Sequence, residues 1–202
     1  MENLKIWIVS IGLYLLCAAC LGTSFLAYND ETEIEVTDES SVVSTAVEAE
    51  EDVSEVGVLT KTYFDVPLDH ALQDHIFAVS EEYGIDPALV IAVIQKESNF
   101  HADSIGDSGN SLGLMQIQPK WHQARMDKLN CPDLLNPYHN VSVGINYLAD
   151  LFGRGKSVEW VLMAYNSGPS NANKNEAQGI VSSYAKAVLN NINNLQTIEM
   201  GV

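Results

Sequence analysis

Residues 89–116 read LVIAVIQKESNFHADSIGDSGNSLGLMQ, and they decide how the rest of the chain is interpreted. The stretch begins as an apolar helix behind Asp86 and Pro87, which suit the N-cap and the first helical position. The face of this helix that is expected to be buried carries the Glu97 carboxyl group at its last turn. Burial raises the pKa of a carboxyl group, and a proton donor that works near neutral pH needs a raised pKa. The helix alone favours a frayed end with Glu97 in water, but motifs further along reverse this preference. The expected buried stripe consists of Leu89, Val90, Val93, Ile94 and Glu97.

The composition excludes one class of partner. The 202 residues carry a formal net charge of -17, and 11 of the 27 acidic residues lie between Asp30 and Glu55, where there is no Lys or Arg. An acidic chain without a basic patch argues against nucleic-acid binding. The three cysteines predict no disulfide framework.

The N-terminal region predicts a membrane anchor over residues 1–27. Ile6–Leu26 contains no charged residue, and 21 helical residues span ~30 Å, enough to cross a bilayer. Lys5 before this run and acidic residues after it favour an N-terminus on the inner side. A cleaved signal peptide is the main alternative. A lipid anchor on Cys20 is disfavoured because Cys17 occupies a place usually held by a small aliphatic or hydroxyl residue.

Residues 28–62 predict an acidic, disordered linker, because a stretch rich in Glu, Asp, Ser and Thr buries too little surface to offset its ordering entropy. Residues 63–202 predict an all-α globular domain of five or six short helices. Residues 101–111 are expected to form a loop, and no β-hairpin signal is present. The expected helices run from Asp69 to Tyr83, from Pro87, from Pro119, from Pro137 behind the N-cap Asn136, from the N-cap Ser157 to Gly168-Pro169, and from Gln178 to Leu195.

Four short motifs now stand in order along the chain: Glu97-Ser98, Gly113-Leu114-Met115-Gln116, Ala164-Tyr165-Asn166-Ser167-Gly168-Pro169 and Tyr184. Together they resemble the motifs of the soluble lytic transglycosylase domain. That domain has a lysozyme-like fold related to goose-type lysozyme. The resemblance covers roughly residues 72–195 and leaves the first 60 residues outside.

The resemblance implies cleavage of peptidoglycan with Glu97 as the only catalytic carboxyl group. In the family this glutamate protonates the oxygen between N-acetylmuramic acid and N-acetylglucosamine. The muramic acid 6-hydroxyl then attacks its own anomeric carbon, and the product is a 1,6-anhydro sugar. Most glycosidases instead flank the bond with two carboxyl groups.

The resemblance also assigns substrate-binding roles near Glu97. Ser98 and Gln116 would be polar contacts to the sugar, and Met115 would line the floor of the cleft. Gly113 would let the backbone approach the glycan, because it has no Cβ atom.

Three further positions follow from the later motifs. Tyr165 and Asn166 would orient the glutamate and the bound N-acetyl group. Tyr184 would donate a hydrogen bond to the catalytic carboxyl group and hold its rotamer. The implied localisation is the bacterial cytoplasmic membrane, with a single pass and an extracytoplasmic domain that acts on peptidoglycan glycan strands; secretion after signal cleavage is the alternative.

Two other functions remain open on the same residues. A lysozyme-type muramidase would need a second acid, which Asp103 or Asp107 could supply. A non-catalytic glycan-binding module is disfavoured because it has no need of Glu97. Neither a metal nor a cofactor is expected, because the five histidines have no ligand neighbours at suitable spacing. Trp121 and Trp160 are expected in the core rather than stacked on sugars.

Overall fold

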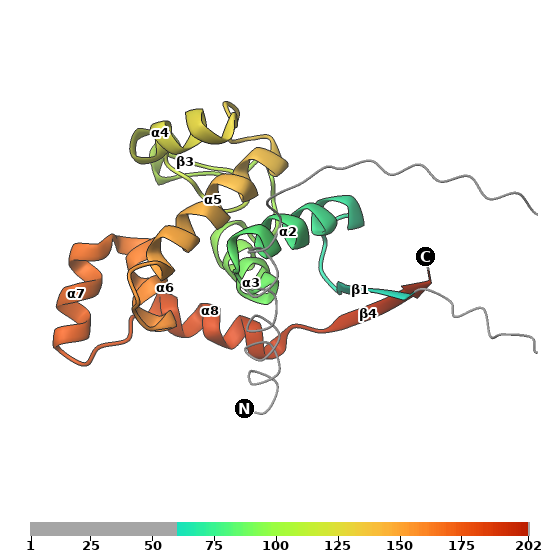
Figure 1. Cartoon of the computed structure of the whole chain (residues 1–202). Coiled ribbons are helices and arrows are strands. Elements are labelled where there is room, and N and C mark those ends of the chain that lie inside the picture. Colours follow the sequence, from blue (N-terminus) through green and yellow to red (C-terminus); the bar gives the residue numbers. More distant parts are fainter. Residues whose placement is uncertain (1–59, 202) are drawn as a thin grey trace, which may run out of the picture. The chain divides into compact units, whose positions relative to one another are not determined.

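The structure is a computed structural model that describes residues 60–201. Seven α-helices and two small two-stranded sheets make up this part of the chain. Figure 1 shows α4 and β3 at one end of the helical body and α7 at another. The elements are β1 (Thr60–Phe64), α2 (His70–Tyr83), α3 (Pro87–Ser98), β2 (Ile105–Gly106), the 3-10 helix η3 (Asp107–Gly109), β3 (Ser111–Leu112), α4 (Pro119–Leu129), α5 (Pro137–Phe152), α6 (Val158–Ser167), α7 (Pro169–Ala177), α8 (Ser183–Asn194) and β4 (Thr197–Gly201).

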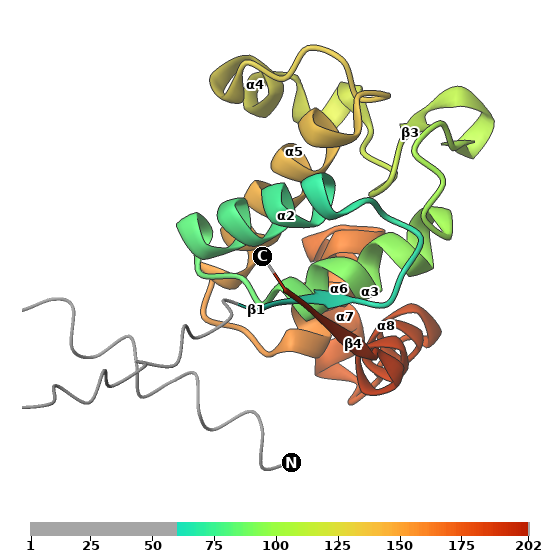
Figure 2. The same ribbon diagram turned by 90° about the vertical axis from the view of Figure 1, so that its right-hand side faces the viewer.

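Helix α3 is the centre of the hydrophobic core. Figures 1 and 2 both show it beneath α2, with α8 on its other side. Every residue from Leu89 to Ile94 is buried, so the helix is covered all round instead of along a single stripe. A helix that is apolar on every face is typical of the centre of a domain. The body around α3 therefore fixes where its C-terminal end, with Glu97, is placed.

Three of the expected helix starts are confirmed by side-chain caps. The Asp86 side chain accepts a hydrogen bond of 2.8 Å from the Ala88 backbone, and Pro87 opens α3. Asn136 caps α5 in the same way, and Ser157 caps α6. Short polar side chains satisfy the free N–H groups of the first turn, which makes helix starts readable from sequence.

The C-terminal helix differs from its expected bounds. Residues 178–195 were expected as one helix, but α7 begins at Pro169, and the last helix begins only at Ser183. The left-handed φ of 67° at Gly179 and the Ser182 side chain, which accepts from the Ala185 backbone, separate the two helices. Ile180, which falls inside the expected helix, lies between the two observed helices and is exposed.

The short strands correct the all-α expectation. β1 pairs antiparallel with β4, so Thr60 lies opposite Gly201, and β2 pairs with β3 inside the expected loop. Three residues of the expected linker, 60–62, thus belong to a strand. The expected anchor and the rest of the linker lie outside the described residues. Within residues 60–201 no helix has the length and apolar character needed to cross a membrane.

Candidate active site

Glu97 lies in the last turn of α3, where its half-buried side chain meets Tyr184 at the start of α8. The Tyr184 hydroxyl donates a hydrogen bond of 2.6 Å to Glu97 Oε1. Further along the same helix pair, Asn191 Nδ2 donates to the Ala92 carbonyl oxygen at 3.4 Å. The two bonds show that α3 and α8 run in opposite directions. Packing along both helices therefore holds the hydroxyl against the carboxyl group.

The surroundings of Glu97 favour its protonated form. Burial raises the pKa of Glu97 and is the largest influence, while the Tyr184 hydrogen bond and the Lys96 charge oppose it. The pKa of Tyr184 is raised as well, first by burial and then by the charge of Glu97. The phenol therefore stays protonated and remains a hydrogen-bond donor. A carboxyl group with a raised pKa keeps its proton at a higher pH than it would in water.

Tyr165 joins the end of α6 to the loop that precedes α4. Its hydroxyl donates to the Met115 carbonyl oxygen at 2.8 Å. Burial raises the pKa of Tyr165, and the negative charge of Glu97 is the second cause, so the two groups interact electrostatically. The next residue, Asn166, is exposed. Tyr165 thus links the Gly-Leu-Met-Gln loop to the neighbourhood of Glu97.

Asn140 on α5 holds this loop, a role that no motif in the sequence marked. Its Oδ1 atom accepts from the Met115 backbone N–H at 2.7 Å, and its Nδ2 atom donates to the carbonyl oxygens of Leu112 and Leu134 at 2.7 and 2.9 Å. A Cβ atom at Gly113 would lie 2.4 Å from Asn140 Nδ2 and from the Leu134 oxygen. This contact accounts for Gly113 through packing within the protein. Close approach of the glycan to the Gly113 backbone stays a prediction.

Two residues expected at the substrate face the protein interior. Ser98 is buried, and its Oγ atom donates to the Ile94 carbonyl oxygen at 3.2 Å. Met115 has no exposed surface, and its sulfur lies only 2.2 Å from where a Cβ atom on Gly144 would stand. Both side chains pack within the protein in this structure. The expected contact of Met115 with the glycan stays a prediction.

The Gln116 side chain stabilises the same loop through hydrogen bonds to backbone carbonyl groups. It has a left-handed φ of 48°, and its Nε2 atom donates to the carbonyl oxygens of Ser104 and Gly113 at 3.1 and 2.9 Å. A Cβ atom at Gly106 would lie 2.3 Å from Gln116 Oε1. Both amide N–H groups of Gln116 are therefore engaged by the loop. Side-chain bonds of this kind hold a backbone in a conformation that a non-glycine residue rarely adopts.

The two aspartates considered as a second acid lie on the loop after α3. Asp103 is exposed. Asp107 is exposed too, and its Oδ2 atom accepts a hydrogen bond of 3.0 Å from Gln118 Nε2. Within the described residues no three His, Cys, Asp or Glu side chains are grouped so that they could hold a metal ion.

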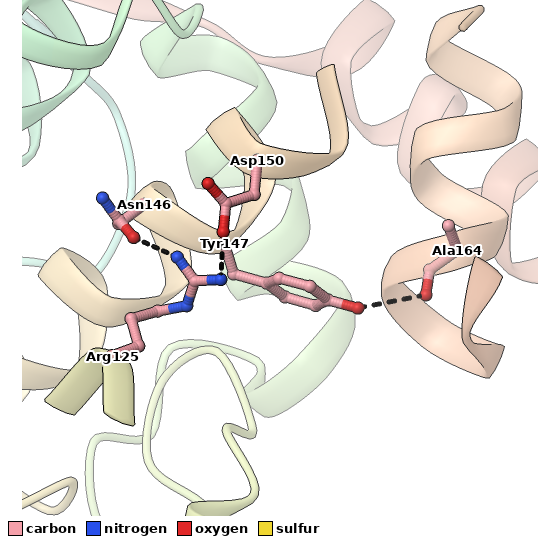
Figure 3. Close-up of polar contacts among 5 residues, drawn as sticks. All are labelled: Arg125, Asn146, Tyr147, Asp150 and Ala164. Atoms are coloured by element: carbon pink, nitrogen blue, oxygen red, sulfur yellow. Dashed lines mark hydrogen bonds and ion pairs between the residues drawn. The ribbon is translucent and has the colours of Figure 1, made fainter. Parts of the chain in front are cut away.

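A polar cluster beside this region was also missed from the sequence. Figure 3 shows the Arg125 guanidinium of α4 bonded to Asn146 and Asp150 of α5, next to the ring of Tyr147. The guanidinium carbon lies 5.4 Å from the Tyr147 ring centroid. The Tyr147 hydroxyl donates to the Ala164 carbonyl oxygen at 3.5 Å. The cluster therefore connects α4, α5 and α6.

Aromatic rings continue from this cluster toward Glu97. The Tyr147 ring lies 5.3 Å from that of Tyr165 and 4.5 Å from that of His122, between centroids. Burial and then the Arg125 charge lower the pKa of His122 to about 4, so this histidine is neutral at neutral pH. The sequence did not predict that these three rings lie together, since His122, Tyr147 and Tyr165 belong to three helices far apart in the chain.

A pocket of about 350 Å³ is lined by residues from the segment after β1, from the end of α3 and from the end of α8. Glu97 does not line it, although Gln95 and Phe100 on either side of Glu97 do. We place the candidate site at Glu97 because the carboxyl group with a raised pKa and its hydroxyl partner are there, whereas the acidic residue that lines the pocket is Asp65. The other lining residues are Asp65, Val66, Pro67, Asn191, Asn194, Leu195 and Gln196.

Comparison with known proteins adds a family and a fold. Residues 74–187 match the family described as Transglycosylase SLT domain. The chain is similar to a transglycosylase of Enterobacteria phage PRD1, with 32% identity over 118 residues, covering 58% of this chain and 42% of the relative. It is also similar to the membrane-bound lytic murein transglycosylase C of Edwardsiella ictaluri, with 35% identity over 91 residues, covering 41% and 24%. The chain thus spans less than half the length of these relatives.

Two solved structures share the fold. The lytic transglycosylase Slt of Pseudomonas aeruginosa, in an inactive mutant, is 20% identical with a TM-score of 0.53. The 70 kDa soluble lytic transglycosylase of Escherichia coli is 23% identical with the same TM-score. Each match covers 62% of this chain and 24% of the other. The lysozyme-like transglycosylase fold expected from the motifs is therefore confirmed for the helical part of the chain.

Proposed function

Because the chain belongs to the Transglycosylase SLT domain family, we propose that it is a peptidoglycan lytic transglycosylase with Glu97 as its single acid and base. The proposed reaction cleaves the bond between N-acetylmuramic acid and N-acetylglucosamine and forms 1,6-anhydromuramic acid. The observation that carries the proposal is the half-buried Glu97 carboxyl group, with a raised pKa and a 2.6 Å hydrogen bond from Tyr184. No cofactor is required.

In the proposed mechanism one carboxyl group serves both proton transfers. Glu97 first gives its proton to the bridging oxygen as the bond from that oxygen to the anomeric carbon breaks. The 6-hydroxyl of the same muramic acid then bonds to the anomeric carbon. Its proton goes to the Glu97 carboxylate, which restores the protonated acid, and no water is consumed. The Tyr184 hydroxyl stabilises the carboxylate between the two transfers.

A single carboxyl group also fits the surroundings better than a pair does. A hydrolase of the usual kind places a second carboxyl group across the bond, where it binds the sugar or a water molecule. Asp107 is engaged by Gln118, and Asp103 is an exposed loop residue. Exposed loop carboxylates are mostly solvated.

The products of a peptidoglycan digest test this function directly. We expect mass spectrometry of the released muropeptides to find anhydro ends, each lighter by one water than the hydrolysed product. Reducing ends in their place would identify a lysozyme-type muramidase, and the absence of any soluble product would leave a binding module.

The role of Tyr184 predicts a change in the pH dependence. Its hydrogen bond lowers the pKa of Glu97, so Tyr184→Phe should raise that pKa further. The falling limb of the rate against pH, which reports loss of the acid proton, should then move to higher pH. At the optimum we expect kcat to fall about 10- to 100-fold, because a hydrogen bond to a charged group contributes roughly 1.5–3 kcal/mol.

Tyr83→Phe is the matched control, since Tyr83 ends α2 and is only partly buried. It should leave both the optimum and the limb unchanged. A Tyr184→Phe variant with a lower kcat but an unmoved limb would show that the hydroxyl does not act on the Glu97 proton.

The proposal includes an extracytoplasmic domain tethered by residues 1–27. This part rests on the uncharged run of Ile6–Leu26 and the acidic stretch behind it. Fractionation of cells that express the full chain tests it. Full-length protein in the membrane after a carbonate wash indicates a retained anchor, whereas a shortened soluble form indicates a cleaved signal peptide.

A further inference from the structure

Trp121 is the most exposed large hydrophobic side chain in the described part of the chain. It keeps 70% of its surface in solvent, whereas Trp160 on α6 keeps 2%. Our expectation that both tryptophans pack in the core is therefore wrong for Trp121. Leaving an indole in water forgoes the stabilisation that its burial would bring, which is of the order of a few kcal/mol. Tryptophan is enriched at interfaces, where its large apolar ring and its N–H group both find partners.

Trp121 stands on a fixed helix. Three residues before it, Gln118 Nε2 donates to Asp107 and to Ser111 Oγ, each at 3.0 Å, which ties the start of α4 to the short β2–β3 sheet. One turn after Trp121, Arg125 is bonded to α5 through Asp150. Side chains four residues apart in a helix lie on the same flank, so Trp121 is on the flank that carries Arg125.

Arg125 on that flank belongs to a packed group with aromatic side chains of α5 and α6. Arg125 lies over the ring of Tyr147, as Figure 3 shows, and the Tyr147 ring packs against Tyr165. The charge of Glu97 acts on Tyr165. Trp121 thus lies one helical turn from Arg125, which is the first of three packed side chains, and the last of them, Tyr165, interacts electrostatically with Glu97.

The Trp121 indole and the neighbouring Lys120 indicate what kind of ligand would bind here. The Lys120 ammonium lies 4.8 Å from the Trp121 ring centroid, so it covers one part of the indole while most of the ring surface stays open. Lys120 is one of ten basic residues in a chain of net charge -17. Sugar rings present a flat C–H face that stacks on an indole, and peptidoglycan stem peptides carry carboxylates that a lysine attracts.

We propose that Trp121 is a carbohydrate-stacking residue that holds an N-acetylhexosamine ring of the glycan strand at a distance from the bond cleaved at Glu97. The inference rests on the proposed function for the identity of the strand. It adds a contact surface on α4 that the four motifs do not include. Trp121 binds and orients the strand and takes no part in proton transfer.

Fluorescence of the full chain measures this binding without turnover. The protein carries Trp7→Phe and Glu97→Gln, which leaves Trp121 and the buried Trp160 as the emitting residues. Titration with the hexamer of N-acetylglucosamine should shift the emission to shorter wavelength as the sugar covers the indole. Adding Trp121→Ala should remove the shift and weaken binding about tenfold, as expected for one aromatic contact, when binding is measured by calorimetry. Trp121→Phe should keep most of the affinity.

Tyr138→Ala is the control, because Tyr138 is an exposed aromatic residue that packs on His75 instead. It should bind the hexamer as the parent does. Equal affinity of the Trp121→Ala and parent proteins would overturn the inference. So would an emission shift that follows protein concentration or added lipid vesicles but not the sugar, since the partner would then be a second copy or a membrane.

Activity separates this inference from the proposed function. With Glu97 intact, Trp121→Ala should raise KM on intact peptidoglycan about tenfold and leave kcat within twofold. An unchanged KM would contradict the role of Trp121 and would leave the proposed function unaffected. A parent protein that releases nothing from peptidoglycan, yet shows the emission shift with the hexamer, would refute the enzymatic proposal and leave the stacking residue supported.

Discussion

Glu97→Gln is expected to abolish the release of soluble muropeptides from purified peptidoglycan, with a loss of at least about 1,000-fold. Glutamine has nearly the same shape, and its Oε1 atom can still accept the hydrogen bond from the Tyr184 hydroxyl. It has no proton to give at the bridging oxygen and no carboxylate to accept one from the 6-hydroxyl. General acid–base catalysis contributes roughly 100- to 10,000-fold, and here one residue performs both transfers.

Three measurements make this result specific. Circular dichroism and thermal unfolding of Glu97→Gln should match the parent, because the substitution keeps the packing of α3 and α8. Binding to insoluble peptidoglycan in a sedimentation assay should also persist. Asp103→Asn and Asp107→Asn are the matched controls and should release muropeptides within about twofold of the parent, since neither takes part in the single-carboxyl mechanism. A loss at Asp107 as large as at Glu97 would replace that mechanism with a two-carboxyl hydrolase.

Local chemistry made much of the fold predictable. Asp86-Pro87 and Asn136-Pro137 each predict where a helix begins. The capping side chain and the fixed φ of proline both act within a few residues, so they can be recognised in the sequence. The central helix was found for a related reason, since its residues are almost all apolar. Its burial on every face was not foreseen, because the sequence does not say how many elements surround a helix.

Long-range pairing was not predictable in this way. β1 and β4 lie at opposite ends of the described chain and pair with each other. β1 has no apolar alternation, and β4 has only Ile198 and Met200 at alternate positions, which is too short a pattern to mark a strand by itself. The start of α7 was missed because Gly168-Pro169 reads as an end, whereas here proline also opens the next helix.

The motifs identified residues that lie near Glu97, but they did not predict where the side chains of those residues point. Tyr184 is 87 residues from Glu97 in sequence, and the two side chains are bonded. Ser98 and Met115 belong to the same motifs but point into the protein. A motif can contain residues that contact the substrate and residues that only hold the backbone in place. Sequence alone does not separate these two roles. Asn140 illustrates the second role, because nothing in its local sequence marks it.

Asn140→Ala is expected to destabilise the domain by about 3–5 kcal/mol, the largest effect on stability that we predict. The asparagine makes three hydrogen bonds, to the backbones of Leu112, Met115 and Leu134, and it has no exposed surface. Alanine would leave these groups without their partner, and each buried unpaired group costs roughly 1–3 kcal/mol. Thermal unfolding should show Tm lower by about 10–20 °C. Asn194→Ala, at an exposed position on α8 where the amide bonds only its own helix, should change Tm by less than about 2 °C.

Activity of Asn140→Ala at a temperature where it is folded tests whether the loop matters to Glu97. The Met115 carbonyl oxygen accepts from Tyr165, whose ring lies within the electrostatic reach of the carboxyl group. If Asn140 sets the position of this oxygen, the variant should lose kcat even where circular dichroism reports full helix content. A folded variant with parental kcat would mean that Tyr165 is positioned by α6 alone. The loop's hydrogen bonds would then serve stability and leave the chemistry to the pairing of α3 with α8.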